Sequence, residues 1–176
     1  MSIIEIVRLV LFLILSVLLL VFTLRRPHAH RGYRFLAFEC ILALIFLQSD
    51  MWFVEPLRPV QILSWIFLAG SIFLALHGFL LLSRQGLPDQ DLENTTQLVT
   101  TGAYRFIRHP LYASLILFGT GAALKRCSIL SLALLAALML AVYATARVEE
   151  RTNLERFGER YAAYMRRSKR FVPFIF

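Results

Sequence analysis

Five stretches of apolar residues dominate the sequence, and they run in blocks rather than at the period of an amphipathic helix or strand. Residues 9–24, 61–83 and 127–146 carry no charge at all. A helix needs about 20 mostly apolar residues to cross a hydrocarbon core of ~30 Å. The pattern therefore predicts an all-α, polytopic membrane protein with about five transmembrane helices. We place these helices at residues 3–24, 33–54, 60–83, 110–124 and 127–147.

The fourth stretch is too short for a full span, because residues 111–124 form about 21 Å of helix at 1.5 Å per residue. Its end is rich in small residues that allow close helix approach, which predicts a tight hairpin with the fifth helix. After the fifth helix, four apolar residues are spaced 3, 4 and 3 apart, as on one face of an amphipathic helix. They are Leu154, Phe157, Tyr161 and Tyr164, and Gly158 interrupts them.

Composition and charge agree with a membrane location. Hydrophobic residues make up 59% and charged residues 17% of the chain, against roughly 45–50% and about 25% in soluble domains. The net charge is +8, but the basic residues lie mostly where apolar blocks end. Membrane topology and contact with membrane lipids explain them better than nucleic acid does. The basic loops predict an N-terminus outside and a C-terminus in the cytosol, beside the 84–109 loop.

The cysteines give no sign of a metal site or a disulfide framework. Cys40 and Cys127 lie in or at the edge of apolar segments and are best explained as packing residues. No Gly-x-Gly-x-x-Gly unit is present, which argues against a soluble dinucleotide-binding type of cofactor site.

Two polar motifs lie at the ends of the fourth and fifth segments. The first is Gly-x-Tyr-x-x-x-Arg-His-Pro-x-Tyr, which begins at Gly102 and ends at Tyr112. Pro110 suits the first turn of a helix, so the free N–H groups of that turn form a partial positive site for an anionic group. The second motif is Glu-Glu-x-x-x-Leu-x-x-Phe-Gly-x-x-Tyr-x-x-Tyr, which begins at Glu149.

Together these motifs resemble the isoprenylcysteine carboxyl methyltransferases, and membrane phospholipid N-methyltransferases are similar. The resemblance covers residues 96–173. It implies S-adenosylmethionine as the cofactor and a lipophilic substrate that enters from the bilayer, one candidate being the carboxylate of a prenylated cysteine. We accordingly expect one membrane domain over residues 1–176, with three N-terminal spans in 1–83 and the cofactor-binding part in 84–176.

The resemblance also implies which residues line the cofactor pocket. Glu149 completes the pocket from the fifth segment. The other residues that it implies are Thr96, Gln97, Leu98, Val99, Tyr104, His109, Pro110, Leu111 and Tyr112.

The chemistry of S-adenosylmethionine fits these residue types. A helix N-terminus with His109 suits its carboxylate, Glu149 or Glu150 suits its ammonium or ribose hydroxyls, and tyrosine faces suit the adenine or the sulfonium. Adjacent glutamates lie ~100° apart on a helix, so we expect one of the two to face the pocket and favour Glu149.

The catalytic prediction is Arg147. Eukaryotic members of the resembled family have an arginine one turn before the glutamate, where this chain has Thr145. Arg147 is the nearest arginine, and we expect it to orient an anionic substrate. Methyl transfer is a direct displacement that depends on positioning more than on acid–base catalysis.

Three alternatives remain open at this stage. They are a phospholipid N-methyltransferase, an NADPH-dependent reductase of the sterol type with a related fold, and a membrane-binding module without enzymatic activity. Two intramembrane groups, Glu39 and His77, lie at similar predicted depth. They either pair or line a substrate entrance, or they make structural hydrogen bonds between helices.

Overall fold

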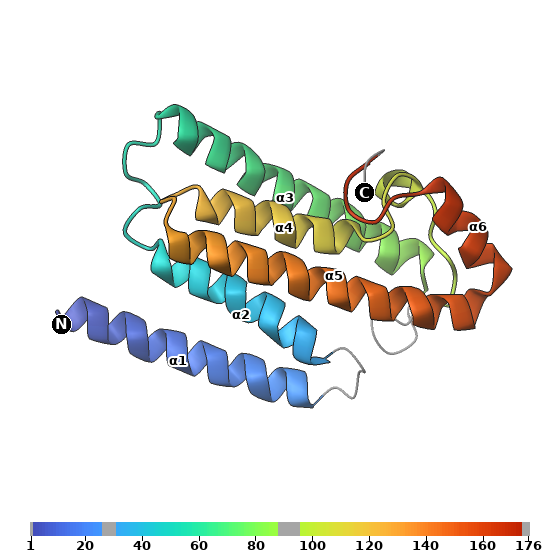
Figure 1. The fold of residues 1–176 in the computed structure, drawn as a ribbon, viewed down its shortest axis with the longest axis horizontal. Coiled ribbons are helices and arrows are strands. Elements are labelled where there is room, and N and C mark those ends of the chain that lie inside the picture. Colours follow the sequence, from blue (N-terminus) through green and yellow to red (C-terminus); the bar gives the residue numbers. More distant parts are fainter. Residues whose placement is uncertain (1, 26–30, 88–95, 174–176) are drawn as a thin grey trace. The chain divides into compact units, whose positions relative to one another are not determined.

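We describe the fold from a computed structural model, which describes residues 2–25, 31–87 and 96–173 (Figure 1). Over these residues the chain is all-helical, as predicted, with no named strand. The six α-helices and one 3₁₀ helix are α1 (Ile3–Leu24), α2 (Arg31–Leu47), α3 (Pro59–Gln85), η1 (Gly102–Arg105), α4 (Pro110–Ala123), α5 (Ile129–Phe157) and α6 (Glu159–Arg167).

Each predicted apolar stretch forms a helix, but the helices differ in length from the predictions. Among the described residues, α1, α3 and α5 are long and apolar enough to cross a membrane, whereas α2 has 17 residues and α4 has 14. The helix α2 ends at Leu47 rather than at residue 54, because the polar run that begins at Gln48 turns away. The Gln48 side chain donates a hydrogen bond to the carbonyl of Arg126 at 3.1 Å.

The helices contribute to two compact units. Unit 1 comprises Met1–Leu68 and Phe118–Thr145, and unit 2 comprises Ala69–Leu117 and Ala146–Phe176. The predicted positions of the two termini across a membrane stay predictions, and part of the loop between α3 and η1 lies outside the described residues.

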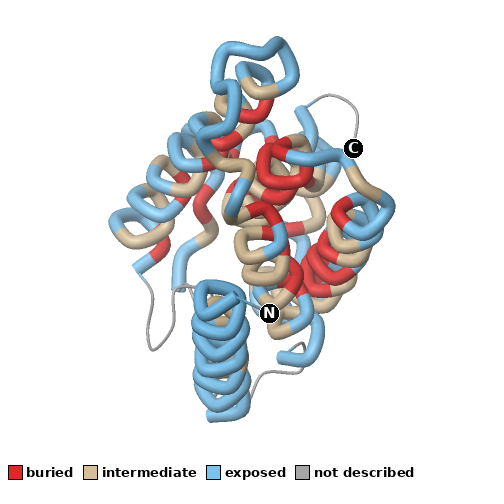
Figure 2. Tube along the Cα trace, turned by 90° about the vertical axis from the view of Figure 1, so that its left-hand side faces the viewer, coloured by how far each residue is buried: buried red, intermediate tan, exposed pale blue. Residues whose placement is uncertain are grey.

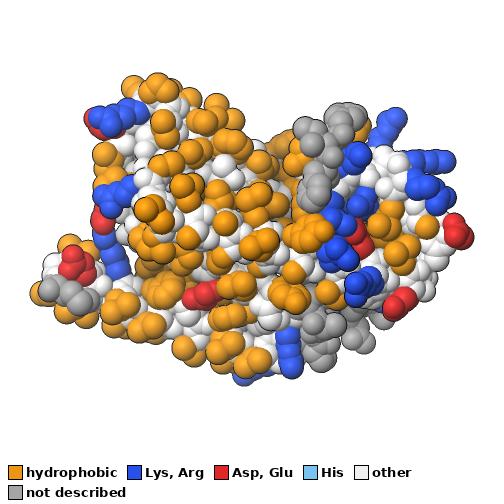
Figure 3. All heavy atoms as spheres, in the orientation of Figure 1, with side chains coloured by type: hydrophobic (Ala, Val, Ile, Leu, Met, Phe, Trp, Pro, Cys, Tyr) orange, Lys and Arg blue, Asp and Glu red, His pale blue; other side chains and the backbone are white. Residues whose placement is uncertain are grey.

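In unit 1, α1 packs beside α2, with the Phe12 and Phe46 rings 5.6 Å apart, centre to centre, and polar contacts lie along the same side. The Ser16 hydroxyl donates to the Glu39 carboxylate at 2.6 Å, and Arg8 pairs with Asp50 at 2.5 Å. No residue of α1 is buried (Figure 2), and hydrophobic side chains cover its outward face (Figure 3). This exposed apolar surface is what a helix in contact with lipid presents.

The core of unit 1 joins the end of α4 to α2 and to the start of α5. Leu44, Ala122 and Ala123 are buried together, with Phe118, Leu134 and Leu135 packed against them. Close packing extends to α3, where the Ser64 hydroxyl donates to the Gly121 carbonyl at 2.7 Å. The small residues at the end of α4 therefore lie where helices approach closely.

In unit 2, the stretch that contains η1 lies against the C-terminal part of α3. Gly102 has a φ of +56°, a conformation that glycine adopts readily. This turn brings the Ala103 N–H within 3.3 Å of His77 Nε2, which accepts its hydrogen bond. Glu39 and His77 thus each have a hydrogen-bond partner in their own unit.

The predicted interruption of the C-terminal helix at Gly158 is confirmed. The helix α5 continues to Phe157, ten residues beyond the predicted end, and α6 begins after Gly158, whose φ is +55°. The α6 side chains Tyr161 and Tyr164 are buried, and its basic residues are exposed. The Tyr164 hydroxyl donates to the Tyr104 carbonyl at 2.6 Å, which fixes α6 against η1.

Gly121 provides a test of the packing in unit 1. A Cβ at this position would lie 2.8 Å from Leu68 Cγ and 2.9 Å from the Ser64 carbonyl oxygen. We expect Gly121→Ala to destabilise the protein by about 1–3 kcal/mol through overpacking, which lowers the thermal unfolding midpoint in detergent by about 2–10 °C. Gly70→Ala is the matched control, because nothing lies within 4 Å of a Cβ there. Equal midpoints for the two variants would contradict the close approach.

Candidate functional site

The predicted helix start at Pro110 is confirmed, and it places Arg108 and His109 just before the first turn of α4. The His109 carbonyl accepts the Ala113 N–H at 2.9 Å, which begins the helical hydrogen-bond ladder. Proline is well suited to this position because the first N–H groups of a helix have no partner within it. The side chains of both residues are largely buried.

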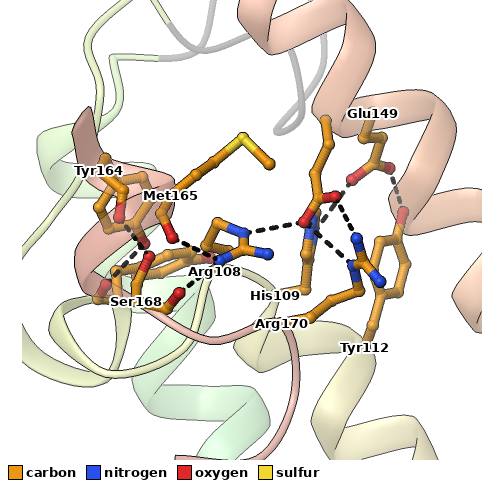
Figure 4. A network of polar contacts seen from close by, with 10 residues as sticks. Arg108, His109, Tyr112, Glu149, Tyr164, Met165, Ser168 and Arg170 are labelled. Atoms are coloured by element: carbon orange, nitrogen blue, oxygen red, sulfur yellow. Dashed lines mark hydrogen bonds and ion pairs between the residues drawn. The ribbon is translucent and has the colours of Figure 1, made fainter. Parts of the chain in front are cut away.

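Glu150 is the centre of a polar network in unit 2 (Figure 4). Its Oε1 accepts from Arg108 Nε at 2.8 Å and from Arg170 Nε at 3.1 Å, and its Oε2 accepts from Arg170 NH2 at 2.7 Å. Only 5% of the Glu150 side chain is exposed. A buried carboxylate is costly unless cations and hydrogen bonds compensate it, and here two guanidinium groups do so.

Glu149 reaches the same histidine from its own side of α5. Its Oε2 lies 3.6 Å from His109 Nδ1, while Glu150 Oε1 lies 3.5 Å from His109 Nε2. The Tyr112 hydroxyl donates to the other Glu149 oxygen. The two nitrogens of one imidazole ring point in opposite directions, so both carboxylates lie near His109. That Glu149 rather than Glu150 faces the cofactor stays a prediction.

Sequence reasoning missed the contribution of the residues after α6. Arg108 NH1 donates to the carbonyls of Met165 at 3.3 Å and Ser168 at 2.5 Å, and Arg170 supplies the second guanidinium on Glu150. The basic residues of the tail look alike in the sequence, so no spacing or motif distinguishes Arg170. Its role becomes visible only when the chain folds back.

The other predicted cofactor residues lie in different parts of unit 2. Thr96 and Gln97 donate backbone hydrogen bonds to the Gly86 carbonyl at 3.0 and 3.1 Å, next to the end of α3. Leu98 is half-buried, Val99 is buried, and Leu111 is half-buried in the first turn of α4. Arg147 is exposed on α5, one turn before Glu150.

Burial and nearby charge alter the acid–base behaviour of the site. Burial alone would lower the pKa of His109, but the attraction of Glu149 and Glu150 outweighs it, so the pKa of His109 is raised above its usual value. Burial also raises the pKa of Tyr104, and the neighbouring Tyr164 and Glu149 raise it further. The site therefore favours a protonated imidazole between two carboxylates.

This arrangement predicts a pH-dependent stability. A raised histidine pKa adds stability that is fully present below about pH 6.5, the usual pKa of histidine, and is lost as the pH rises through the pKa of the folded protein. We expect the thermal unfolding midpoint in detergent to fall as the pH rises above about 6.5. His109→Gln removes this slope and His77→Gln retains it. A slope unchanged in His109→Gln would contradict the assignment.

Comparison with known proteins identifies the family to which the chain belongs. No curated protein matches the chain at a significant level. A family model described as phospholipid methyltransferase matches residues 60–160, which are more than half of the chain and include Arg108, His109, Glu149 and Glu150. This match agrees with the resemblance found in the two motifs. The chain belongs to the phospholipid methyltransferase family of membrane methyltransferases.

Proposed function

We propose that this protein transfers a methyl group from S-adenosylmethionine to a lipophilic acceptor in the membrane. The observation that carries the proposal is the buried cluster of Arg108, His109, Glu149 and Glu150, which lies within the region matched by the methyltransferase family. Glu149 and Glu150 follow the charge-free stretch 127–146 closely in sequence. These polar side chains therefore lie at the end of an apolar helix, a position that both a lipid acceptor and a water-soluble cofactor can reach.

The mixed charges of the cluster fit this cofactor. The amino-acid end of S-adenosylmethionine carries one carboxylate and one ammonium, and the cluster offers cations and carboxylates within a few ångströms of each other. The positive charge of His109, whose pKa is raised, and the first turn of α4 would both attract the carboxylate. When bound, the cofactor supplies an electrophilic methyl group on a sulfonium.

The two glutamates differ in how they could serve a ligand. Both oxygens of Glu150 are held by arginines, and 5% of its side chain is exposed. The Glu149 side chain is 15% exposed. We therefore assign the ammonium or the ribose hydroxyls to Glu149. The faces of Tyr104 and Tyr112 would pack against the adenine or the sulfonium.

The acceptor is proposed only as a lipid that carries a nucleophilic polar group. A phospholipid amine and the carboxylate of a prenylated cysteine both satisfy this description. Arg147, exposed and one turn before Glu150, remains our proposal for the residue that orients an anionic part of the acceptor. The product of the reaction distinguishes these acceptors, because base releases methanol from a methyl ester and leaves an N-methyl group intact.

The test is methyl transfer from labelled S-adenosylmethionine by the purified protein, reconstituted in vesicles made from a total lipid extract that includes prenylated cysteine. We expect label in the lipid fraction, followed by base treatment to identify the bond. Glu149→Gln should weaken cofactor binding by about 10- to 100-fold, since it removes a charge-assisted hydrogen bond. Glu155→Gln, at an exposed position of the same helix, should bind as the wild type does.

Cofactor titration separates the competing functions. Saturable binding of NADPH without binding of S-adenosylmethionine would favour the reductase and overturn the proposal. If neither cofactor binds and Glu149→Gln has no effect on any property, the protein is a membrane module without this activity.

A further inference from the structure

The residues after α6 return to the site as a short non-helical segment, residues 168–171, which we call the C-terminal segment. The Lys169 N–H donates to the Phe106 carbonyl at 2.9 Å, and the N–H groups of Arg108 and His109 donate to the carbonyls of Lys169 and Arg170 at 2.8 and 3.2 Å. A parallel bridge pairs Ile107 with Lys169. The backbone of the C-terminal segment is therefore bound directly to the stretch that carries Arg108 and His109.

Two side chains of this segment end on residues of the site. Arg170 holds Glu150 with two hydrogen bonds, one to each carboxylate oxygen, at 3.1 and 2.7 Å. The Phe171 ring lies 6.1 Å from the His109 ring, centre to centre, and is buried. The neighbouring Lys169 side chain is exposed. Figure 4 shows Arg170 beside His109 and Tyr112 rather than pointing away to solvent.

The second arginine on Glu150 does more than balance its charge. Arg108 alone supplies one positive charge and one hydrogen bond to Oε1, which leaves the carboxylate able to rotate about its last bond. A guanidinium that contacts both oxygens fixes this rotation, because its two N–H groups match the geometry of a carboxylate. Oε1 then stays next to His109 Nε2, at 3.5 Å.

We propose that Arg170 is a positioning residue, which fixes Glu150 and through it the orientation of His109 for cofactor binding. The proposal rests on the proposed function for the role of His109, but the geometry that it explains is independent of that function. The C-terminal segment is thus part of the site, and backbone pairing alone already holds it in place. The role of the Arg170 side chain therefore concerns the Glu150 carboxylate rather than the attachment of the segment.

The first test follows the titration of His109 in the protein without cofactor, by NMR of histidine-labelled protein in detergent with His109→Gln for assignment. The charged and titratable groups that face His109 are Glu149 and Glu150 from α5, Arg108 in its own segment, Tyr112 on α4, and Arg170 through Glu150. Arg170→Lys keeps the nearby cation but loses the two-point contact, so Oε1 is no longer held next to His109 Nε2. The protonated ring then loses part of its stabilisation, so the His109 midpoint should fall below that of the wild type.

A role in charge balance alone, or in holding the C-terminal segment alone, predicts a different result. If Arg170 served only as a cation, Arg170→Lys would leave the His109 midpoint where it is in the wild type. If Arg170 served only to hold the C-terminal segment, the thermal unfolding midpoint would fall as well. An unchanged His109 midpoint, or a fall that comes with a lower unfolding midpoint, overturns the proposal. Lys169→Gln is the matched control, since it removes a neighbouring charge from an exposed position and should leave the midpoint unchanged.

The second test measures S-adenosylmethionine affinity. Arg170→Gln should weaken binding by about 10-fold or more, and Arg170→Lys by less, because lysine keeps the charge but not the two-point contact. If Arg170→Gln does not fold, Arg170→Lys decides: reduced affinity with an unchanged unfolding midpoint supports the proposal, and wild-type affinity overturns it. If the wild type binds no S-adenosylmethionine while the His109 midpoint still falls in Arg170→Lys, the proposed function fails and the positioning role stands.

Discussion

The ion pairing of Glu150 is the constraint on which the candidate site depends. Removing one carboxylate from water costs several kcal/mol unless its oxygens receive strong hydrogen bonds. One arginine comes from the stretch before α4 and the other from the C-terminal segment, so three separate parts of unit 2 must meet at this carboxylate. The position of His109, the direction of the tail and the environment of Glu149 follow from that meeting.

The structure around this ion pair explains the break between α5 and α6. A continuous helix would carry the tail away from Glu150 along the same axis. Gly158, with its φ of +55°, lets the chain change direction, and the Tyr164 hydroxyl then fixes α6 to the Tyr104 carbonyl at 2.6 Å. The buried faces of Tyr161 and Tyr164 are therefore part of what delivers Arg170 to Glu150.

The sequence allowed the helices to be predicted, and the structure brings together several of the residues proposed for the site, namely His109, Tyr112, Glu149 and Glu150. Long apolar blocks leave few choices other than helix, and Pro110 marks a helix start by its covalent geometry. The ion pair joins Glu150 in α5 to Arg170, which lies beyond the end of α6. No periodic pattern in the sequence indicates such a contact. The expected angle of ~100° between Glu149 and Glu150 on a helix could not reveal an imidazole whose two nitrogens lie near both carboxylates.

Adjacent glutamates in one helical turn acquire different roles because their surroundings differ, not because their chemistry does. Glu150 has both oxygens occupied by guanidinium groups and is nearly inaccessible. Glu149 is held by one phenol and one imidazole and keeps more of its surface exposed. A ligand that takes over contacts of Glu149 leaves the ion pairs of Glu150 undisturbed. A ligand that took over contacts of Glu150 would leave Arg108 and Arg170 without their carboxylate partner. The ion pair thus makes Glu150 a fixed support and leaves Glu149 as the carboxylate that a ligand can engage.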